Sequence, residues 1–405
     1  MSRSAVENER VVSGMRPTGK LHLGHYHGVL KNWIDMQHQY DCFFFIADWH
    51  ALTTHYETPE NIPDHVTQLM IDWLAAGISP NHATMFVQSD VPQHAELHLL
   101  LSMMTPLSWL ERVPTYKDQK ENLKERDLGT YGFLGYPLLQ SADILIYKAN
   151  QVPVGEDQVV HVEMTREVAR RFNHFYGQEA GFEDTCEAAI SKMGKKNAKM
   201  YRNLRRAYQE KGDTEAIEVA HALLESQQNI TIGDRERLYG YLEGISKIIL
   251  PEPDAKLTKA SKLPGLDGRK MSKSYNNTID MREEADSLTQ KIKKMPTDPA
   301  RMRLTDPGDP NKCPVWQFHQ AYTDEKTHEW VKEGCTSAGI GCIQCKQPVI
   351  DSVQAELDPI RERAKQYENN HDYVKSIIHQ GGEAARDIAA ETMQDVIEAM
   401  RFSHT

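Results

Sequence analysis

The chain of 405 residues has no apolar run of the roughly 18 residues that a membrane-spanning helix needs. Its mean hydropathy of −0.60 agrees with this absence. The first residues, MSRSAVENERVV, lack the basic segment and apolar stretch of a secretory signal peptide. These absences argue against a membrane protein and a secreted one, so we expect a cytoplasmic location.

The sequence also has few cysteines and fewer basic than acidic residues, 47 against 58. Six cysteines in a reducing compartment do not form a disulfide framework. A net charge of −11 excludes a protein coated in positive charge, although a local basic groove is compatible with it. The overall composition, with 40% hydrophobic and 26% charged residues, is typical of a globular protein. At roughly 150 residues per domain, the length predicts two or three domains.

Short apolar segments predict β-strands, and helical patterns lie between them. The predicted strands are 10–13, 42–47, 84–88 and 151–154. Apolar residues at 29, 30, 33 and 34 share one helical face, and 63–76 is a second helical stretch. The segment CFFFIA is apolar on both faces, which is typical of a central parallel strand. Alternating strand and helix predicts a doubly wound α/β fold.

The second half of the chain changes in composition. Between 191 and 211 there are eight Lys or Arg residues and one acid, Glu210. An amphipathic helical pattern continues to about residue 247, and prolines and glycines then predict a loop up to Lys270. Beyond 280 the pattern is mostly helical.

The segment 18–25, TGKLHLGH, follows the first predicted strand and precedes the first predicted helix. Backbone N–H groups and the helix dipole form a phosphate site at such a position. Gly24 has no Cβ, so a nucleotide can approach its backbone closely. His22 and His25 are three residues apart, and both can donate to charge that develops during transfer. A surface turn with two solvated histidines is the alternative interpretation.

The segment 268–274, GRKMSKS, lies in a Gly-rich loop. Lys270 and Lys273, together with two hydroxyls, form a mobile cationic clamp suited to a leaving pyrophosphate. A solvated basic loop is the ordinary alternative for a short charge run. The two motifs together, in this order and about 250 residues apart, are far more specific than either alone.

HLGH followed by KMSKS resembles the paired signatures of class I aminoacyl-tRNA synthetases. Three segments more specifically resemble the tryptophanyl-tRNA synthetase family: 13–19 (SGMRPTG), 47–53 (ADWHALT) and 152–158 (VPVGEDQ). The resemblance covers about 1–177 and 250–405. It implies activation of L-tryptophan with ATP to tryptophanyl-adenylate, and then transfer to tRNA(Trp). It also implies Mg²⁺ on the ATP phosphates and a homodimer.

The family has a Rossmann-type catalytic domain and a helical anticodon-binding domain. The resemblance therefore implies four ranges, which are a first catalytic part over 1–177, a helical basic insertion over 178–250, the KMSKS loop completing the catalytic domain over 251–282, and a helical anticodon-binding domain with a four-cysteine metal site over 283–405. The net positive charge over 191–211, within this insertion, predicts contact with tRNA phosphates, with a solvated helix face as the equal alternative. Replacing Arg202, Arg205 and Arg206 by Ala is expected to weaken tRNA binding.

The resemblance also assigns roles to single residues. The implied catalytic residues are His22, His25, Lys270, Lys273 and Lys117. The implied ATP-binding residues are Arg16, Pro17, Thr18, Gly24, His25, Gly155, Glu156, Asp157, Lys270, Met271, Ser272, Lys273 and Ser274. Asp157 and Gln158 come directly after a predicted strand, at the edge where open α/β sheets bind ligands.

The implied tryptophan-binding residues are Asp143, Gln140, Tyr136, Gln158, His50 and Gly14. Asp143 matches the family aspartate that accepts the indole N–H, and indole has one donor and no acceptor. Such a site strongly rejects analogues that lack the donor. Tyr136, Gln140 and Asp143 at this spacing also resemble tyrosyl-tRNA synthetases, so tyrosine activation is the close alternative. A non-catalytic RNA-binding paralogue with a redox-sensing metal site is a more distant one.

Four of the six cysteines cluster as Cys313-x21-Cys335-x6-Cys342-x2-Cys345. Four thiolates can hold tetrahedral Zn²⁺ or a [4Fe–4S] cluster, and the spacing does not choose between them. A minority of bacterial tryptophanyl-tRNA synthetases carry a [4Fe–4S] cluster with nearly this spacing, and this resemblance favours iron–sulfur with a structural role. Two further cysteines lie outside the cluster, and Cys42 is expected to be inert in a buried strand whereas Cys186 has no evident partner.

Overall fold

The computed structural model describes residues 9–113, 129–177, 181–244, 247–258 and 263–401. Contacts divide the chain into two compact units. The first unit comprises Met1–Pro92, Gln151–Gln158 and Ala255–Arg386, and the second comprises Gln93–Asn150, Val159–Asp254 and Asp387–Thr405. The boundaries of these units differ from those of the four ranges expected from the sequence. The four ranges stay a prediction. Within the described ranges, no helix is long and apolar enough to cross a membrane.

A five-stranded sheet in the order β3-β2-β1-β4-β5 organises the fold. Its strands are β1 (Arg10–Met15), β2 (Asp41–Ile46), β3 (Ala83–Val87), β4 (Gln151–Val154) and β5 (Asp254–Leu257). β1 pairs in parallel with β2 and β4, and β2 pairs in parallel with β3. All but the first residue of β2 are buried, as a strand covered by helices on both faces requires. The predicted doubly wound α/β fold and its first four strands are confirmed.

The prediction of a continuous loop before Lys270 was wrong at β5. Asp254 N–H donates to the Asn150 carbonyl (2.8 Å), and Thr258 N–H donates to the Val154 carbonyl (3.1 Å). The strand reads DAKL and has no fully buried residue. Such a strand is held by backbone pairing at the sheet edge, so its sequence carries no apolar pattern to predict it.

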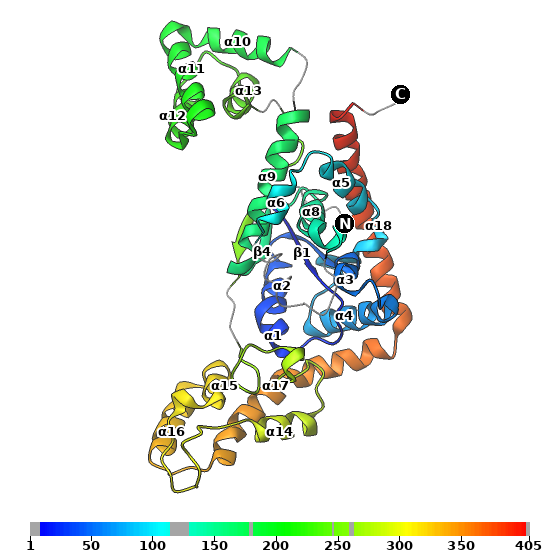
Figure 1. The fold of residues 1–405 in the computed structure, drawn as a ribbon, viewed down its shortest axis with the longest axis vertical. Coiled ribbons are helices and arrows are strands. Elements are labelled where there is room, and N and C mark those ends of the chain that lie inside the picture. The colour runs from blue at the N-terminus through cyan, green and yellow to red at the C-terminus, as the bar shows by residue number, and fades with distance from the viewer. Residues whose placement is uncertain (1–8, 114–128, 178–180, 245–246, 259–262, 402–405) are drawn as a thin grey trace. The chain divides into compact units, whose positions relative to one another are not determined.

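The first unit packs helices around this sheet. They are α1 (Leu23–His25), α2 (Lys31–Met36), α3 (Asp48–His55), α4 (Ile62–Ala76), α14 (Ala285–Lys294), α15 (Pro314–Tyr322), α16 (Glu325–Thr336), α17 (Cys342–Glu368) and the first part of α18 (His371–Ala399). The long helix α17 packs against α4, α14 and α15 (Figure 1). The expected helical character beyond 280 is therefore confirmed.

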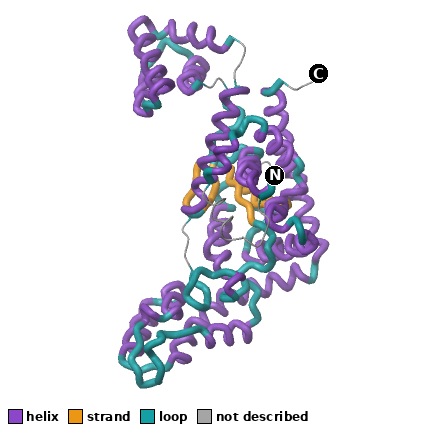
Figure 2. Tube along the Cα trace, in the orientation of Figure 1, coloured by secondary structure: helices purple, strands orange, loops and turns teal. Residues whose placement is uncertain are grey.

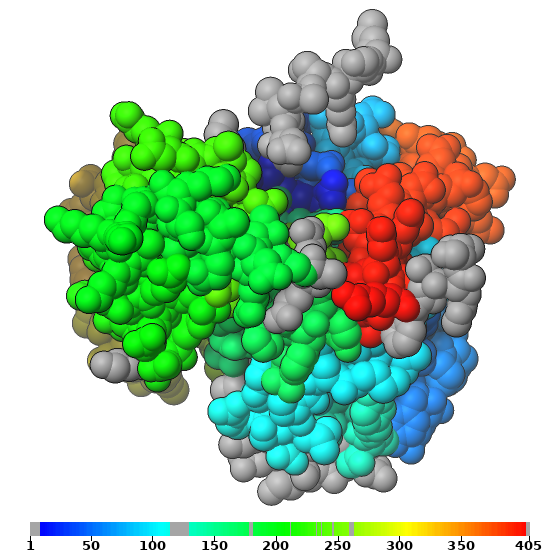
Figure 3. Space-filling view, turned by 90° about the horizontal axis from the view of Figure 1, so that it is seen from above, coloured from blue at the N-terminus to red at the C-terminus, as the bar shows by residue number. Residues whose placement is uncertain are grey.

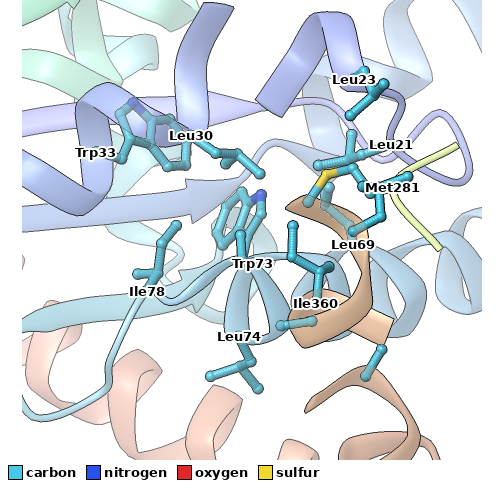
Figure 4. Packing of buried hydrophobic residues seen from close by; sticks show 14 of the residues in the cluster. Leu21, Leu23, Leu30, Trp33, Leu69, Trp73, Leu74, Ile78, Met281 and Ile360 are labelled. Atoms are coloured by element: carbon cyan, nitrogen blue, oxygen red, sulfur yellow. The ribbon is translucent and has the colours of Figure 1, made fainter. Parts of the chain in front are cut away.

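Aromatic packing fixes the core of the first unit. Trp33 on α2 stacks on Phe44 of β2 at a ring-centroid distance of 4.3 Å and meets Trp73 of α4 edge-on at 5.1 Å. Such pairs add about 0.5–1.5 kcal/mol beyond the area they bury. Figure 4 shows Leu21 and Met281, which flank the two sequence motifs, beside Ile360 of α17 in the same core. Residues of both motif-bearing segments are thus anchored in the hydrophobic core of the unit.

The second unit is built from helices. They are α5 (Gln93–Ser102), α6 (Leu107–Glu111), α8 (Tyr131–Leu145), α9 (Val159–Tyr176), α10 (Phe182–Lys192), α11 (Gly194–Lys211), α12 (Thr214–Glu225) and α13 (Ile232–Glu243), together with the end of α18. The described residues of the segment that holds α10–α13 are in helices and loops, without a strand (Figure 2). These helices form one contiguous body (Figure 3). Their core is their own, with the buried Tyr201 hydroxyl donating to the Leu238 carbonyl (2.5 Å).

Gly381 in α18 is a place where a side chain has no room. A Cβ at Gly381 would lie 1.8 Å from the Met85 carbonyl oxygen on β3, whereas the nearest atom to a Cβ at Gly382 is 3.4 Å away. We expect Gly381→Ala to lower the free energy of unfolding by about 2–4 kcal/mol, the scale of a severe core clash. Gly382→Ala is the matched control, and helix propensity predicts no loss or a gain of up to about 1 kcal/mol. Chemical unfolding checks both variants, and equal stabilities would contradict the close approach.

Candidate active site

The carboxyl ends of adjacent strands bring the predicted motifs to one edge of the sheet. The turn 16–22 follows β1, the segment 155–158 follows β4, and α3 begins after β2. β1 lies between β2 and β4, so the chain leaves β1 toward one side and returns on the other. This switch point is where open α/β sheets bind ligands. The expected position of Asp157 and Gln158 directly after a strand is confirmed.

The HLGH turn is paired with the segment that follows the KMSKS loop. Leu23 N–H donates to the Ile279 carbonyl (2.9 Å), and Met281 N–H donates to the Leu21 carbonyl (2.9 Å). His22 thereby faces Asp280 in a short antiparallel bridge. Backbone hydrogen bonds therefore join two motifs that are far apart in the sequence.

A buried ion pair clamps this junction. The Asp72 carboxylate on α4 accepts the Leu21 N–H (2.9 Å) and lies 2.7 Å from Nε of Arg282. The Arg282 guanidinium also donates to Gln68 (2.7 Å) and to Glu368 on α17. Burial raises the pKa of Asp72 to about 6, although the Arg282 charge and the Leu21 N–H act in the opposite direction. Sequence reasoning missed this clamp because neither residue belongs to a motif.

His22 and His25 lie together as neutral imidazoles. Their ring centroids are 3.8 Å apart. Burial, followed by the charge of Lys273, lowers the pKa of His22 to about 4. Burial, followed by His22, Lys273 and Lys270, lowers the pKa of His25 to about 3. At neutral pH both rings are uncharged, so they offer directed N–H donors while the lysines supply the positive charge.

The KMSKS loop lies against the first turn of the chain. Lys273 Nζ donates to the Thr18 carbonyl (2.9 Å), so one catalytic candidate contacts the turn that holds predicted nucleotide-binding residues. The Met271 side chain is buried in the core of the first unit and anchors the loop. Lys270 and Ser274 are exposed. The two predicted motifs are therefore brought together.

Asn277 organises this loop from within. Its side chain is 3% exposed, accepts the Ser272 N–H (2.8 Å) and donates to Asp267 (2.7 Å) and to the Lys270 carbonyl (3.1 Å). The hydrogen bond from Asn277, although opposed by burial, is the main reason that the pKa of Asp267 falls to about 2. A Cβ at Gly265 would lie 2.2 Å from the Asn277 amide nitrogen, so glycine is required there. No sequence signal marked Asn277.

The other predicted nucleotide-binding residues lie on the two turns of the switch point. Arg16, Thr18, Glu156 and Asp157 are exposed, and Pro17 is buried. The remaining glycines have little room for a side chain. A Cβ would lie 2.4 Å from the Phe45 ring at Gly14, 2.9 Å from the His22 imidazole at Gly24 and 2.9 Å from the Asp157 carboxylate at Gly155.

The predicted tryptophan-binding residues divide between the units. Gly14, His50 and Gln158 belong to the first unit, whereas Tyr136, Gln140 and Asp143 lie on α8 of the second. Spacings of four and three residues place the latter three on one face of α8.

Asp143 has a partner that sequence reasoning missed. Nδ1 of His94 on α5 lies 2.6 Å from the Asp143 carboxylate. A histidine in QHAELH carries no local pattern that points to a carboxylate 49 residues away. Lys117, the remaining catalytic candidate, lies outside the described residues.

The four clustered cysteines line one cavity, together with Arg301 and Lys346. Cys313 precedes α15, Cys335 lies in α16, and Cys342 and Cys345 lie in the first turn of α17. Burial, followed by the other three cysteines, raises the pKa of Cys345 to about 12. In the described part of the chain, no group of three or more His, Cys, Asp or Glu residues is arranged to hold a metal ion.

Comparison with known proteins identifies the class of this fold and site. A family model described as tRNA synthetases class I (W and Y) matches residues 5–199 and 226–358, and the chain belongs to this family. It is 64% identical to the tryptophan–tRNA ligase of Ralstonia nicotianae over 397 residues, which cover 98% of this chain and 99% of that relative. It is 43% identical to the tryptophan–tRNA ligase of Thermotoga maritima over 395 residues, which cover 97% and 99%.

Solved structures agree with this assignment. Tryptophanyl-tRNA synthetase from Campylobacter jejuni, complexed with ADP and tryptophan, superposes with a TM-score of 0.72 at 28% identity, covering 96% of this chain and 99% of that one. The family match leaves 200–225 unmatched, inside the predicted insertion.

Asp72→Asn keeps the shape of the side chain but leaves the buried Arg282 guanidinium without its buried counter-ion. We expect the free energy of unfolding to fall by about 3 kcal/mol, the scale for breaking a buried ion pair. ATP–pyrophosphate exchange should fall about tenfold or more, because the two motifs lose a shared anchor.

Glu368→Gln is the matched control, since it removes the exposed partner of the same guanidinium. It should change stability by less than about 1 kcal/mol and leave exchange near the wild-type rate. Equal effects of the two variants would show that the clamp has no special role.

Proposed function

We propose that the chain is an ATP-dependent tryptophan–tRNA ligase. The observation that carries this proposal is the 64% identity to a tryptophan–tRNA ligase over nearly the whole of both chains. The family also includes tyrosine enzymes, but the relatives named above are tryptophan enzymes, which supports tryptophan over tyrosine. Retention of HLGH, KMSKS and GEDQ argues against a non-catalytic RNA-binding paralogue, which has no need of all three.

The reaction proceeds in two steps. A carboxylate oxygen of tryptophan bonds to the α-phosphorus of ATP, and the bond to the bridging oxygen breaks to release pyrophosphate. The terminal ribose hydroxyl of tRNA(Trp) then attacks the activated carbonyl and releases AMP. Neither step needs a protein nucleophile, so the chain contributes orientation and electrostatic stabilisation. Mg²⁺, when bound with ATP, neutralises part of the phosphate charge.

The described residues support a division of labour between the motifs. Lys273, held near the Thr18 carbonyl, and the exposed Lys270 supply positive charge for the departing pyrophosphate. His22 and His25 donate hydrogen bonds as neutral rings, because their pKa values are lowered. Glycines at 14, 24 and 155 keep side chains away from the switch point, where the nucleotide binds.

Amino-acid-dependent ATP–pyrophosphate exchange tests the proposed function directly. We expect exchange with tryptophan at a kcat/KM at least about 10⁴-fold above that with tyrosine, because a buried acceptor fitted to indole rejects a mismatched ring strongly. Comparable or faster exchange with tyrosine would contradict the assignment of tryptophan as the substrate. No exchange with any amino acid would favour the non-catalytic alternative.

The four clustered cysteines fit a [4Fe–4S] cluster, and we infer that they hold one. Their thiols line a common cavity, and burial raises the pKa of the Cys313 thiol, although the backbone N–H groups of Val315 and Trp316 act in the opposite direction. Arg301 Nη1 lies 3.9 Å from the Cys335 thiol, which supports a site built for negative charge. Four ligands of one zinc ion would stand about 3.8 Å apart, whereas a four-iron cluster takes one thiolate per iron and a wider spacing. The resemblance to cluster-carrying members of the family is what favours the cluster over zinc.

Anaerobically purified protein should contain about four iron atoms per chain and show sulfide-to-iron charge-transfer absorption. Cys342→Ser should remove the absorption and most of the iron. Cys186→Ser is the control, because Cys186 is buried in the separate core of α10–α13 and should leave both unchanged. Stoichiometric zinc in a colourless protein would overturn the cluster, and the absence of both metals would overturn the metal site.

The insertion presents one basic stripe, and we infer that it contacts tRNA phosphates. Lys195, Lys199, Arg202 and Arg206 on α11 are exposed, at helical spacings of four, three and four. Arg205, grouped with them from the sequence, does not belong to the stripe. Its guanidinium lies 3.7 Å from the Tyr241 ring centroid and donates to the Tyr241 carbonyl (2.8 Å), so Arg205 stabilises the insertion itself.

Replacing Lys195, Lys199 and Arg206 together by Ala should weaken tRNA(Trp) binding and leave exchange unchanged. The slope of log affinity against log salt should become shallower by about 2–3, since each lost phosphate contact removes about 0.7–0.9. A charge-preserving triple variant, Lys195→Arg, Lys199→Arg and Arg206→Lys, is the control. An unaltered affinity and salt slope in the Ala variant would show a merely solvated helix face.

A homodimer is supported by apolar side chains on the surface of the second unit. Leu99, Met103 and Leu107 on and between α5 and α6 are 56–71% exposed. Clustered exposed apolar residues are typical of protein interfaces. A tRNA substrate also supports the cytoplasmic location expected from the sequence.

A further inference from the structure

Three buried polar side chains, one of them on α8, are linked in a row by two hydrogen bonds. His94 Nδ1 is 2.6 Å from the Asp143 carboxylate, and His94 Nε2 is 2.7 Å from the Tyr147 hydroxyl. His94, Asp143 and Tyr147 are 0%, 1% and 0% exposed. His94 comes from α5, Asp143 from α8, and Tyr147 from the turn after α8. All three belong to the second unit, so this geometry is internal to it.

The directions of these hydrogen bonds follow from the chemistry of the groups. An ionised carboxylate only accepts, so His94 Nδ1 carries the proton and donates to Asp143. Burial, followed by the neighbouring Asp143 charge, raises the pKa of Tyr147 well above its usual value, so its phenol stays protonated. The Tyr147 hydroxyl therefore donates to His94 Nε2. The chain runs in one direction, from phenol to imidazole to carboxylate.

The direction of these hydrogen bonds determines whether Asp143 offers a hydrogen-bond acceptor or a donor to a ligand. A buried carboxylate without a donor would take up a proton, and a protonated carboxyl can turn a donor rather than an acceptor toward its ligand. The donor from His94 favours the charged form and holds the carboxylate plane in one orientation. Tyr147 in turn fixes the tautomer of His94. A purely structural bridge between α5 and α8 would need no such direction.

We propose that His94, with Tyr147 behind it, is a positioning residue that keeps Asp143 an oriented, ionised acceptor for the indole N–H of the substrate. The proposal rests on the proposed function and on the role that the family resemblance implies for Asp143, which is to accept that N–H. His94 then determines specificity without touching the substrate. Its loss should affect substrates that donate an N–H more than substrates that do not.

The test compares tryptophan with β-(benzothiophen-3-yl)alanine, in which sulfur replaces the indole N–H. The readout is the ratio of their kcat/KM values in ATP–pyrophosphate exchange with the full-length protein. His94→Leu should lower this ratio about tenfold or more, the scale of one hydrogen bond to a charged group. His94→Asn keeps an N–H donor near the position of Nδ1 and should restore part of the ratio. Tyr147→Phe removes only the hydroxyl and should lower the ratio about threefold to tenfold.

A structural role and a positioning role give different results in this comparison. Lost packing would reduce exchange with both substrates equally and leave the ratio unchanged, which would overturn the proposal. If His94→Leu does not fold, Tyr147→Phe and His94→Asn decide by the same ratio, since both nearly preserve volume or hydrogen bonding. His319 in α15 is also fully buried, and Thr323→Ala, which removes its side-chain partner at 3.2 Å, is a control that should not move the ratio.

Asp143→Asn separates failure of the proposal from failure of the proposed function. If it collapses the ratio while the His94 and Tyr147 variants do not, Asp143 reads the indole unaided and only the proposal is overturned. If Asp143→Asn also leaves the ratio unchanged, the assigned role of Asp143 in tryptophan recognition fails. A collapse of the ratio in all three positions supports both.

Discussion

The ion pair between Asp72 and Arg282 is the constraint on which the site depends. Both charges are almost fully buried, and removing two charges from water costs several kcal/mol per ion. A buried pair of this kind adds little net stability, so its value lies in what it holds. Asp72 holds the backbone of Leu21, just before HLGH, and Arg282 holds the end of the segment 279–281. The pair thus adds a side-chain anchor to the backbone hydrogen bonds that join motifs about 250 residues apart.

Once the two motifs are fixed, their electrostatics follow from proximity. Lys270 and Lys273 lie near His25 and add to the effect of burial in keeping its ring neutral. A positively charged ring pair beside two lysines would repel itself in the absence of a nucleotide and strain the turn. Neutral imidazoles avoid this repulsion and still provide donors at defined positions. The division into mobile charge on the lysines and directed donors on the histidines therefore follows from packing as much as from chemistry.

Sequence analysis predicted the parts of the molecule that local patterns encode. Buried strands, glycine turns and the two motifs leave signals within a few residues, and the structure places HLGH and KMSKS together as expected. What it missed depends on residues that meet across long separations. His94 lies 49 residues from Asp143, Asn277 belongs to no motif, and β5 has no apolar pattern. The contact of Arg205 with the Tyr241 ring also joins residues far apart in the sequence, and a count of charges does not reveal it.

These misses share a physical cause. Each motif residue that faces a ligand needs a fixed orientation and protonation state, and both are imposed by a second polar group that faces the core. Asp72 does this for the turn before His22, Asn277 for Ser272, and His94 for Asp143. Such supporting groups are buried and bonded to partners that are mostly distant in the sequence, so no local pattern identifies them. Motifs therefore reveal which chemistry a chain can perform, whereas the geometry that makes the chemistry selective lies in single buried residues outside them.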